Sequence, residues 1–436
     1  VCVSKTLAKT KYAYPDEKLD NIWQNLLLNQ FHDILPGTAI AWVVDQTVKE
    51  LNWSCSQLRT LIKDTLNRVD QPFINKVKLT KSARAYELFN DNCRIKIDKL
   101  GYISSYEIKT SNNFEQLIPK GQKFAVLQLL DDKPIQWDTW DIDKSAFHAI
   151  KEFIKPDKTV VNSNGVTFDF KSDKSLFSLT ISLNNQSSGP ELDIRVDWAE
   201  EEKLLKLALP LDLAANITKA ETQYGLIERP VYNNLLADDA KFETSMQRFV
   251  FIENNDLQIG VVNNGLYGFD STPIVGGGTQ LRPTILKSSK YPDPRSEKNK
   301  YSDFKISLVA GQRNNNNSVL DMILDKANQL NNEFIFDYSQ FLEIDNLQGK
   351  LVLDWIKLAD DKSGDIIARF YEPYGARAKS NIKLSKLLQN YKVKEVDLLE
   401  TDNLPNDIYK SYKAKNDNIL VLETQPFYLV TLRFSK

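Results

Sequence analysis

The chain has 436 residues, of which 56 are Lys or Arg and 58 are Asp or Glu, so its formal net charge is −2. The hydrophobic fraction of 42% is enough for several cores and excludes wholesale disorder, and the length corresponds to about three domains. The balanced charge argues against nucleic-acid binding, which needs a basic face. The sequence contains no run of about 18 apolar residues, so no membrane-spanning helix is predicted.

Two helices are predicted within residues 1–72. Pro15 and Asp16 are typical of a helix start, and apolar residues then recur with helical spacing until Pro36-Gly37 ends the helix. A second helix is expected from about Thr38, with an apolar seam at steps of four and three. Two such helices cannot bury both faces alone. We therefore interpret 1–72 as the end of a three-helix domain whose other part precedes Val1.

From about residue 71 the hydrophobic period changes from 3.6 to 2, which predicts antiparallel strands with one buried face each. Several alternating runs are separated by turn residues, and this pattern is typical of a large β-sandwich. The domain is predicted to span 73–335. The alternating runs are Cys93 to Ile97, Val166 to Phe170, Phe177 to Leu183, Leu192 to Trp198 and Leu205 to Leu211.

The last hundred residues repeat this alternation after a short connector. A helix is expected between Val319 and Leu330, beside the four asparagines 314–317. Further alternating runs begin at Leu351, Ile366 and Phe427 and predict a small β-sandwich over 336–436. The predicted fold class is therefore α+β, mostly β.

The most informative local motif is the stretch 29–38, Asn-Gln-Phe-His-Asp-Ile-Leu-Pro-Gly-Thr. It places His32 and Asp33 where a helix is expected to end. A neutral imidazole is a common zinc ligand, and a neighbouring carboxylate can contact substrate or orient a ligand. From the residues alone, a half-buried histidine that caps the last helical turn is the favoured interpretation, because a lone histidine is rarely a ligand.

A second cluster, 137–143, combines tryptophans with carboxylates. Flat Trp faces stack on the C–H faces of sugars, and carboxylates accept hydrogen bonds from hydroxyls, so Trp140 and Asp141 are candidate carbohydrate contacts. From the residues alone, the favoured interpretation is an aromatic anchor that packs a loop between domains, which is more common for tryptophan pairs. Two further motifs are given structural roles: 371–375 is expected to be a turn, and His148 is expected to pack within an apolar stretch.

The remaining residues do not form a complete metal site or a nucleotide-binding site. Three scattered cysteines, Cys2, Cys55 and Cys93, form no disulfide or zinc framework and fit a reducing compartment. With only two histidines, the chain cannot provide an all-histidine metal site. The glycines 276–278 lack the strand–loop–helix context of a nucleotide site.

Several motifs in order along the chain resemble the family-38 glycoside hydrolases, which are retaining α-mannosidases. The segment 26–38 is the most specific, and the spacing is similar to that of the cytosolic and bacterial branch. The other matching segments are 129–143, 196–206, 224–230, 264–270, 291–294 and 371–375.

The resemblance implies that some site residues lie in this chain and the others in a part of the protein not present in this sequence. Family members carry an N-terminal α/β barrel with the carboxylate nucleophile, the general acid and a His-x-Asp pair that binds zinc. His32 would correspond to the zinc ligand from the helical domain, and Asp33 to a carboxylate that contacts sugar hydroxyls. Trp140 and Asp141 would lie at the rim.

The resemblance therefore implies the C-terminal portion of a zinc-dependent retaining α-mannosidase, inactive without the N-terminal catalytic domain of the same protein. Its partners would be that domain and a mannose-containing oligosaccharide, and neither nucleic acid nor membrane is expected. A homo-oligomer is possible. The expected location is cytoplasmic. The alternative is a non-catalytic carbohydrate-binding or oligomerisation module.

Overall fold

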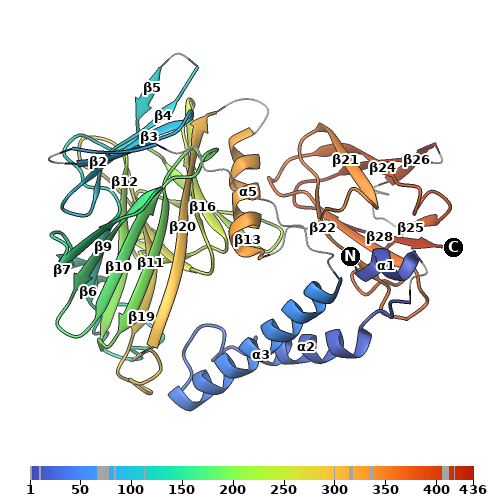
Figure 1. Ribbon diagram of the computed structural model, residues 1–436, viewed down its shortest axis with the longest axis horizontal. Helices are drawn as coiled ribbons and strands as arrows, with labels where there is room; N and C mark the ends of the chain where they lie inside the picture. The colour runs from blue at the N-terminus through green and yellow to red at the C-terminus, as the bar shows by residue number, and fades with distance from the viewer. Residues whose placement is uncertain are drawn as a thin grey trace.

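A computed structural model of the protein describes residues 2–8, 11–65, 78–82, 85–111, 113–298, 300–313, 318–333, 337–404, 412–416 and 418–436. A helical hairpin, a large sandwich and a small sandwich lie next to one another (Figure 1). The predicted class, α+β and mostly β, is confirmed. The domain limits 1–72, 73–335 and 336–436 stay predictions, because both internal boundaries lie outside the described residues.

Three helices form the N-terminal region: α1 (Cys2–Leu7), α2 (Asp16–Leu28) and α3 (Ala41–Thr65). The prediction that one helix continues to Pro36-Gly37 is wrong, since α2 ends at Leu28 and successive turns follow. The Asn29 side chain donates to the Asn25 carbonyl at 2.8 Å and to Glu50 of α3 at 3.3 Å. These bonds satisfy a terminal carbonyl and direct the chain toward α3.

The large sandwich contains a nine-stranded and a six-stranded antiparallel sheet, with a five-stranded sheet above them in Figure 1. In spatial order, the nine-stranded sheet comprises β14 (Gly225–Pro230), β13 (Ile217–Thr222), β16 (Phe249–Glu253), β17 (Leu257–Asn263), β20 (Lys300–Gln312), β11 (Glu191–Trp198), β10 (Leu176–Ser182), β9 (Gly165–Lys171) and β8 (Lys158–Val161). The six-stranded sheet comprises β15 (Thr244–Ser245), β18 (Gly268–Pro273), β19 (Thr279–Ser288), β12 (Lys203–Leu211), β6 (Val126–Asp131) and β7 (Ile150–Glu152). The five-stranded sheet comprises β1 (Lys78–Lys81), β2 (Ala85–Phe89), β3 (Cys93–Asp98), β4 (Ile103–Lys109) and β5 (Phe114–Gln116).

The predicted alternation is confirmed in β9, β10 and β11, whose apolar residues are buried at every second position. Strand β12 differs, because every residue after Lys203 is buried. It lies between β19 and β6, and its second face holds Lys206, whose Nζ lies 2.6 Å from Glu243 and 2.9 Å from Asp270. A buried ammonium group needs such paired carboxylates.

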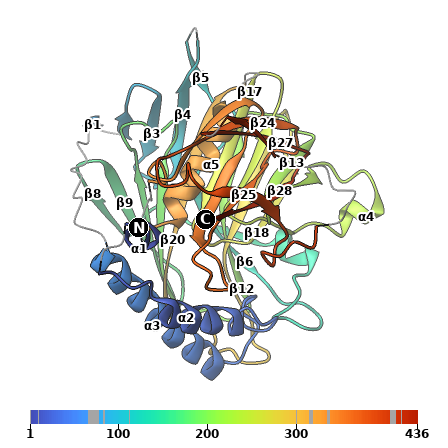
Figure 2. The same cartoon turned by 90° about the vertical axis from the view of Figure 1, so that its right-hand side faces the viewer.

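Helix α5 (Ser318–Asn331) confirms the predicted connector helix and also covers the large sandwich. It packs on β17 and β20, where Ile323 is fully buried. A Cβ at Gly260 would approach Ile323 Cδ1 to 2.6 Å, so the glycine permits the close helix–sheet contact. Two shorter helices, η1 (Lys144–His148) and α4 (Leu236–Asp239), lie in loops, and α4 protrudes from the molecule in Figure 2.

The small sandwich pairs two four-stranded antiparallel sheets, as the sequence predicts. Helix α1 belongs to this unit spatially, because Val3 is part of its hydrophobic core. Strand β28 begins at Leu429, so Phe427, expected in the alternating run, precedes the strand and is exposed. The sheets comprise β21 (Leu342–Gln348), β24 (Ala378–Leu384), β27 (Ile419–Thr424) and β26 (Tyr412–Asn416), and β22 (Val352–Leu358), β23 (Ile366–Tyr371), β28 (Leu429–Ser435) and β25 (Lys392–Val396).

Candidate functional site

The turn between α2 and α3 presents His32 to solvent. The His32 side chain is 78% exposed, its ring centroid lies 4.2 Å from that of Phe31, and its Nε2 lies 3.7 Å from Asp33 Oδ2. The imidazole is therefore not capping a helical turn, which is the interpretation that the residues alone favour. It projects from an ordered turn with one carboxylate beside it.

Polar contacts hold this turn in place. Asn25 Nδ2 donates to Ser54 Oγ at 2.7 Å and to the Glu50 carbonyl at 3.1 Å, which joins α2 to α3. Within the turn, Thr38 Oγ1 donates to Asp33 Oδ1 at 3.2 Å. This bond restricts the rotamer of the Asp33 carboxylate while about half of its side chain remains exposed.

The predicted tryptophan cluster forms a second loop, between β6 and η1. The ring centroids of Trp137 and Trp140 lie 5.9 Å apart at a steep angle, and Tyr291 adds a third ring 6.4 Å from Trp140. Trp140 is 48% exposed. Asp141 is exposed and accepts a hydrogen bond only from the Ile142 N–H within the described chain. The loop thus offers open aromatic faces and an open carboxylate.

A third loop, 289–296, holds the first two segments together. On one side, Asp138 Oδ2 accepts hydrogen bonds from the backbone N–H groups of Lys290 at 2.7 Å and Tyr291 at 3.1 Å. On the other side, Asp293 Oδ2 accepts the Ala41 N–H at 3.0 Å, at the first residue of α3. Ser296 Oγ donates to the Ala39 carbonyl at 2.8 Å.

These contacts connect both the Trp140 loop and residues 39–41, which follow the His32 turn, to the same loop 289–296. Among the described residues, no hydrogen bond, ion pair or ring contact joins His32 or Asp33 directly to Trp140 or Asp141, so loop 289–296 is the link. The motif 291–294 stands out in the sequence, but no local pattern predicts that it lies at the site. The signal available was an acidic residue between two prolines, which does not reveal contacts 252 residues away.

Asp293 is suited to hold the start of a helix. Its side chain is buried, and the Arg295 guanidinium, together with the Ala41 N–H, holds the pKa of Asp293 well below its usual range. A carboxylate that stays ionised at a helix N-terminus satisfies an orphan N–H and favours the positive end of the dipole. The large sandwich therefore caps the helical hairpin.

The number of ligands that zinc needs can be compared with the donors that the His32 turn provides. Zinc in proteins takes about four ligands, whereas His32 and Asp33 provide one imidazole and one carboxylate. No group of three His, Cys, Asp or Glu side chains suited to a metal occurs within the described residues. The chain thus offers part of a ligand set, and an exposed imidazole fits the role of one ligand.

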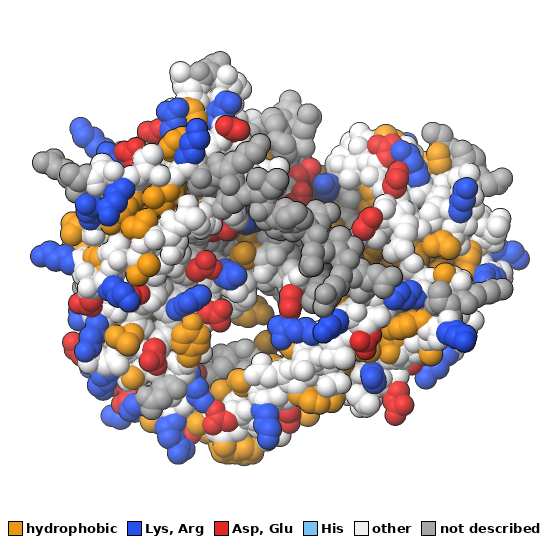
Figure 3. Space-filling view, in the orientation of Figure 1, with side chains coloured by type: hydrophobic (Ala, Val, Ile, Leu, Met, Phe, Trp, Pro, Cys, Tyr) orange, Lys and Arg blue, Asp and Glu red, His pale blue; other side chains and the backbone are white. Residues whose placement is uncertain are grey.

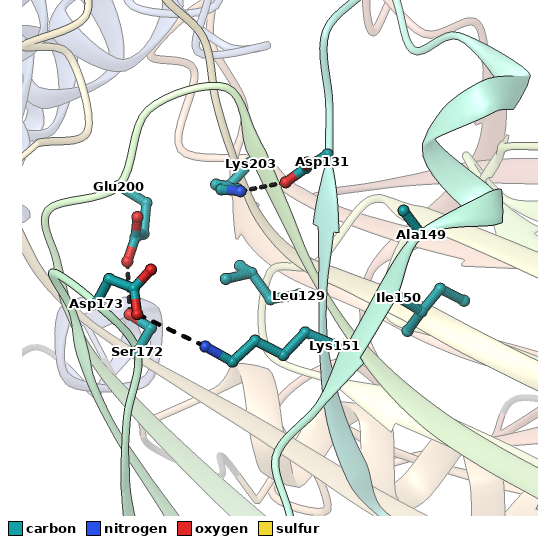
Figure 4. Close-up of a pocket in the computed structure, with 9 residues that line it drawn as sticks. All are labelled: Leu129, Asp131, Ala149, Ile150, Lys151, Ser172, Asp173, Glu200 and Lys203. Carbon is teal, nitrogen blue, oxygen red and sulfur yellow. Dashed lines mark hydrogen bonds and ion pairs between the residues drawn. The ribbon is translucent and has the colours of Figure 1, made fainter.

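The acidic residues before the tryptophan cluster serve local charge balance. Asp131 pairs with Lys203, and the buried Asp132 pairs with Lys287. Asp131 and Lys203 border a pocket of about 310 Å³, in which Lys151 also pairs with Asp173 and Ser172 donates to Glu200 (Figure 4). Each charged side chain that Figure 4 labels has an ion-pair or hydrogen-bond partner, so this pocket offers no free reactive group.

The two motifs given structural roles have different outcomes. The predicted turn at 371–375 is confirmed: Glu372 is fully buried and accepts the N–H groups of Tyr374, Gly375, Ala376 and Phe427 at 2.8–3.1 Å. Such multiple N–H donors replace the hydration that burial removes. The expectation that His148 packs inside is wrong, since the end of η1 leaves its side chain exposed.

The helical hairpin exposes a large apolar surface. Hydrophobic side chains are visible along the lower edge of the molecule in Figure 3, over α2 and α3. Exposed apolar patches of this extent are typical of interaction surfaces. The side chains that are more than half exposed are Trp23, Leu27, Leu28, Phe31, Leu35, Trp42 and Val48.

Three family models match successive parts of the chain. The alpha mannosidase middle domain matches residues 2–69, the family 38 C-terminal domain matches residues 88–295, and the family 38 C-terminal beta sandwich domain matches residues 350–432. The chain belongs to glycoside hydrolase family 38. The resemblance seen in the sequence is thereby confirmed, and the three matches follow the helical hairpin, the large sandwich and the small sandwich.

Relatives of this family-38 chain are α-mannosidases. It is 24% identical to Alpha-mannosidase of Saccharomyces cerevisiae over 99% of this chain and 45% of that protein. It is 22% identical to human Alpha-mannosidase 2C1 over 98% of this chain and 46% of that protein. The chain therefore spans about half the length of these relatives.

The fold agrees with a solved family structure. An alpha-mannosidase from Enterococcus faecalis superposes over the whole of this chain and 65% of its own, with a TM-score of 0.69 and 10% identity. At that identity the likeness concerns the fold. Among the described residues, no helix is long and apolar enough to cross a membrane.

Proposed function

We propose that this chain is the C-terminal portion of a zinc-dependent retaining α-mannosidase, in which His32 is one metal ligand. The observation that supports the proposal best is the position of the imidazole. It is exposed on an ordered turn beside Asp33, and loop 289–296 contacts both the residues that follow this turn and the Trp140 loop. Membership of family 38 and the α-mannosidase relatives give the reaction class.

In this proposal the chain's residues bind and orient a terminal mannose. Asp33 accepts hydrogen bonds from sugar hydroxyls with a carboxylate restrained by Thr38. Trp140 offers a ring face to the C–H groups of the sugar, and Asp141 accepts hydroxyl hydrogens at the rim. A bound zinc ion would supply Lewis-acid polarisation and a template for the sugar oxygens.

The carboxylates that perform the two displacement steps are assigned to an N-terminal catalytic domain of the same protein. Retaining glycosidases use a nucleophile and an acid/base about 5–5.5 Å apart, and we assign neither role to this chain. The exposed apolar surface of α2 and α3 supports a covering partner, and we propose that the catalytic domain covers it. A cytoplasmic location is part of the same proposal, supported by the free thiols of Cys55 and Cys93.

The test uses the longer protein, in which the two histidines of this chain are changed one at a time. His32→Gln should lower turnover of an aryl α-mannoside by at least about 100-fold, with a lower zinc content, because losing a metal ligand weakens both binding and catalysis. His148→Gln is the matched control, an exposed histidine outside the site, and should retain both. The 436-residue chain alone should show no turnover.

Unchanged activity and zinc content in His32→Gln would contradict the metal role. The second candidate, a non-catalytic glycan-binding or oligomerisation module, is favoured by the open rings of Trp137, Trp140 and Tyr291. Glycan binding by the 436-residue chain that is lost in Trp140→Ala, with full-length turnover unaffected by His32→Gln, would support the binding module. A homo-oligomer without sugar affinity would support the oligomerisation module.

A further inference from the structure

A polar cavity of about 730 Å³ lies between the two sandwiches. Its walls come from the β13–β14 hairpin, α5 and β22, elements that Figure 1 shows around the gap between the sandwiches and away from the α2–α3 turn. Ligand sites in proteins commonly have volumes of about 300–1,000 Å³ and often lie between domains. The proposed mannosidase site does not use this cavity.

Hydrogen bonds across the domain interface fix the shape of the cavity. Tyr224 of the large sandwich donates its hydroxyl to Asp354 Oδ2 of the small sandwich at 2.8 Å. Tyr374, held in the turn that Glu372 organises, donates to Asp321 Oδ1 of α5 at 2.6 Å. Both tyrosines belong to motifs, 224–230 and 371–375, that the catalytic proposal leaves without a role. The walls are therefore positioned before any ligand arrives.

The lining combines aromatic rings with hydrogen-bonding groups that have spare capacity. Tyr224 and Tyr371 lie edge to face with centroids 5.3 Å apart. The Tyr338 hydroxyl, the Asp325 carboxylate and the Gln247 side-chain amide line the cavity, and no hydrogen bond to them is present within the described part of the chain. Rings beside free donors and acceptors match a sugar, which has C–H faces and hydroxyls.

The charges in the cavity favour a neutral ligand. Arg248 is the cation of the lining, and its guanidinium already binds Glu221, at 2.9 Å from Nε to Oε2, and Asn328 Oδ1 at 2.7 Å. The remaining charged groups are Asp325 and Asp354, and burial raises the pKa of both carboxyls. An anionic ligand would meet two carboxylates and, among the lining residues that the structure describes, no free cation, whereas hydroxyl groups can donate to the carboxylates.

We propose that this inter-sandwich cavity is a second saccharide site, which binds a neutral hexose oligosaccharide without hydrolysing it. The site would hold a distal part of a branched or extended glycan. It depends on neither the metal nor the catalytic carboxylates, so it is separable from the proposed mannosidase function.

The test titrates the 436-residue chain with an unbranched α-linked mannotriose and maps the contact by hydrogen exchange. Binding should slow exchange in 221–224, 247–248 and 325–332. Tyr338→Phe removes one hydroxyl and Asp325→Asn one charge, and each should weaken affinity by about 3- to 10-fold, as expected for one hydrogen bond to a ligand. Tyr267→Phe, an exposed tyrosine elsewhere, is the matched control and should bind as the unaltered chain does.

The result is decisive in either direction once thermal melts show that the variants fold. Protection confined to the cavity, with weakening by the two cavity variants alone, supports the site. No binding, or binding that Trp140→Ala abolishes while both cavity variants retain it, overturns the proposal, and the second of these results would place the sugar on the Trp140 loop. Neither failure affects the His32 test, which measures turnover and zinc content.

Discussion

The large sandwich and the helical hairpin place tryptophan in opposite environments. Trp198, at the end of β11, is fully buried and its ring lies 6.2 Å from that of Phe177. Trp42, at the start of α3, is 64% exposed. The sandwich completes its own core from two facing sheets, whereas two helices leave an apolar face for another polypeptide. The same residue type therefore stabilises a core in one region and lies on an exposed apolar surface in the other.

The largest expected effect is in the sandwich core. Trp198→Ala should lower the free energy of unfolding by about 3–5 kcal/mol, because it leaves a large cavity among residues that cannot collapse into it. Trp42→Ala, the matched control, should change it by less than about 0.5 kcal/mol in this chain. Urea unfolding followed by circular dichroism measures both. A small loss for Trp198→Ala, or equal losses for the two, would contradict the comparison.

The junction between the two regions should show a pH effect of intermediate size. Burial raises the pKa of Glu297 to about 7, although Lys300 and Lys287 act in the opposite direction. The folded state thus binds this proton more tightly than the unfolded state, so stability should fall as pH rises from about 4.5 to 7. The expected loss is on the order of 2 kcal/mol.

Urea midpoints at pH 5 and pH 8 check the Glu297 prediction. Glu297→Gln should flatten the pH dependence between these two values, because glutamine has no proton to lose. Glu115→Gln, at an exposed glutamate of β5, serves as the control and should keep it. If stability depended on pH in Glu297→Gln as strongly as in the unaltered protein, Glu297 would not be the source of the pH effect.

The smallest effect concerns the cap that the sandwich provides to α3. Asp293→Ala removes the acceptor of the Ala41 N–H and should cost about 1 kcal/mol, the usual price of a lost helix cap. Hydrogen exchange of residues 41–44 should then accelerate about fivefold, while Asp91→Ala, in an exposed turn, should leave it unchanged. Equal protection of residues 41–44 from hydrogen exchange in both variants would show that the start of α3 does not depend on the Asp293 cap. Because the pKa of Asp293 is lowered, the cap should persist at neutral pH and weaken only in strong acid.

The parts of the fold that follow a local pattern could be predicted from the sequence. The period-2 runs of β9 to β11 and the apolar spacing of α5 gave the correct element types, since one face of each is buried. The same reasoning failed for β12, where Lys206 and its carboxylate partners fill a face that a local pattern assigns to solvent. It also extended α2 too far, because the Asn29–Glu50 bond acts between helices.

The candidate site shows the same division. His32, Asp33 and Trp140 could be selected from their motifs, and the structure leaves all three side chains accessible. The link between these segments through loop 289–296 could not be predicted. It depends on hydrogen bonds of Asp293 and Ser296 with a helix start more than 250 residues earlier in the chain. No local pattern encodes a contact of that sequence separation. His148 was misjudged for a related reason, since its apolar neighbours do not cover it.

The packing of α1 on the small sandwich has a consequence for biosynthesis. Val3 completes a core otherwise built from residues 341–434, and Ser4 Oγ donates to Gln340 Oε1 at 2.6 Å. A ribosome makes α1 well before the strands on which it packs, so the segment stays without its partner while the intervening residues are made. Docking of α1 would then mark the moment at which the small sandwich is complete, and a translation product truncated before β28 would leave α1 exposed to quality-control proteases.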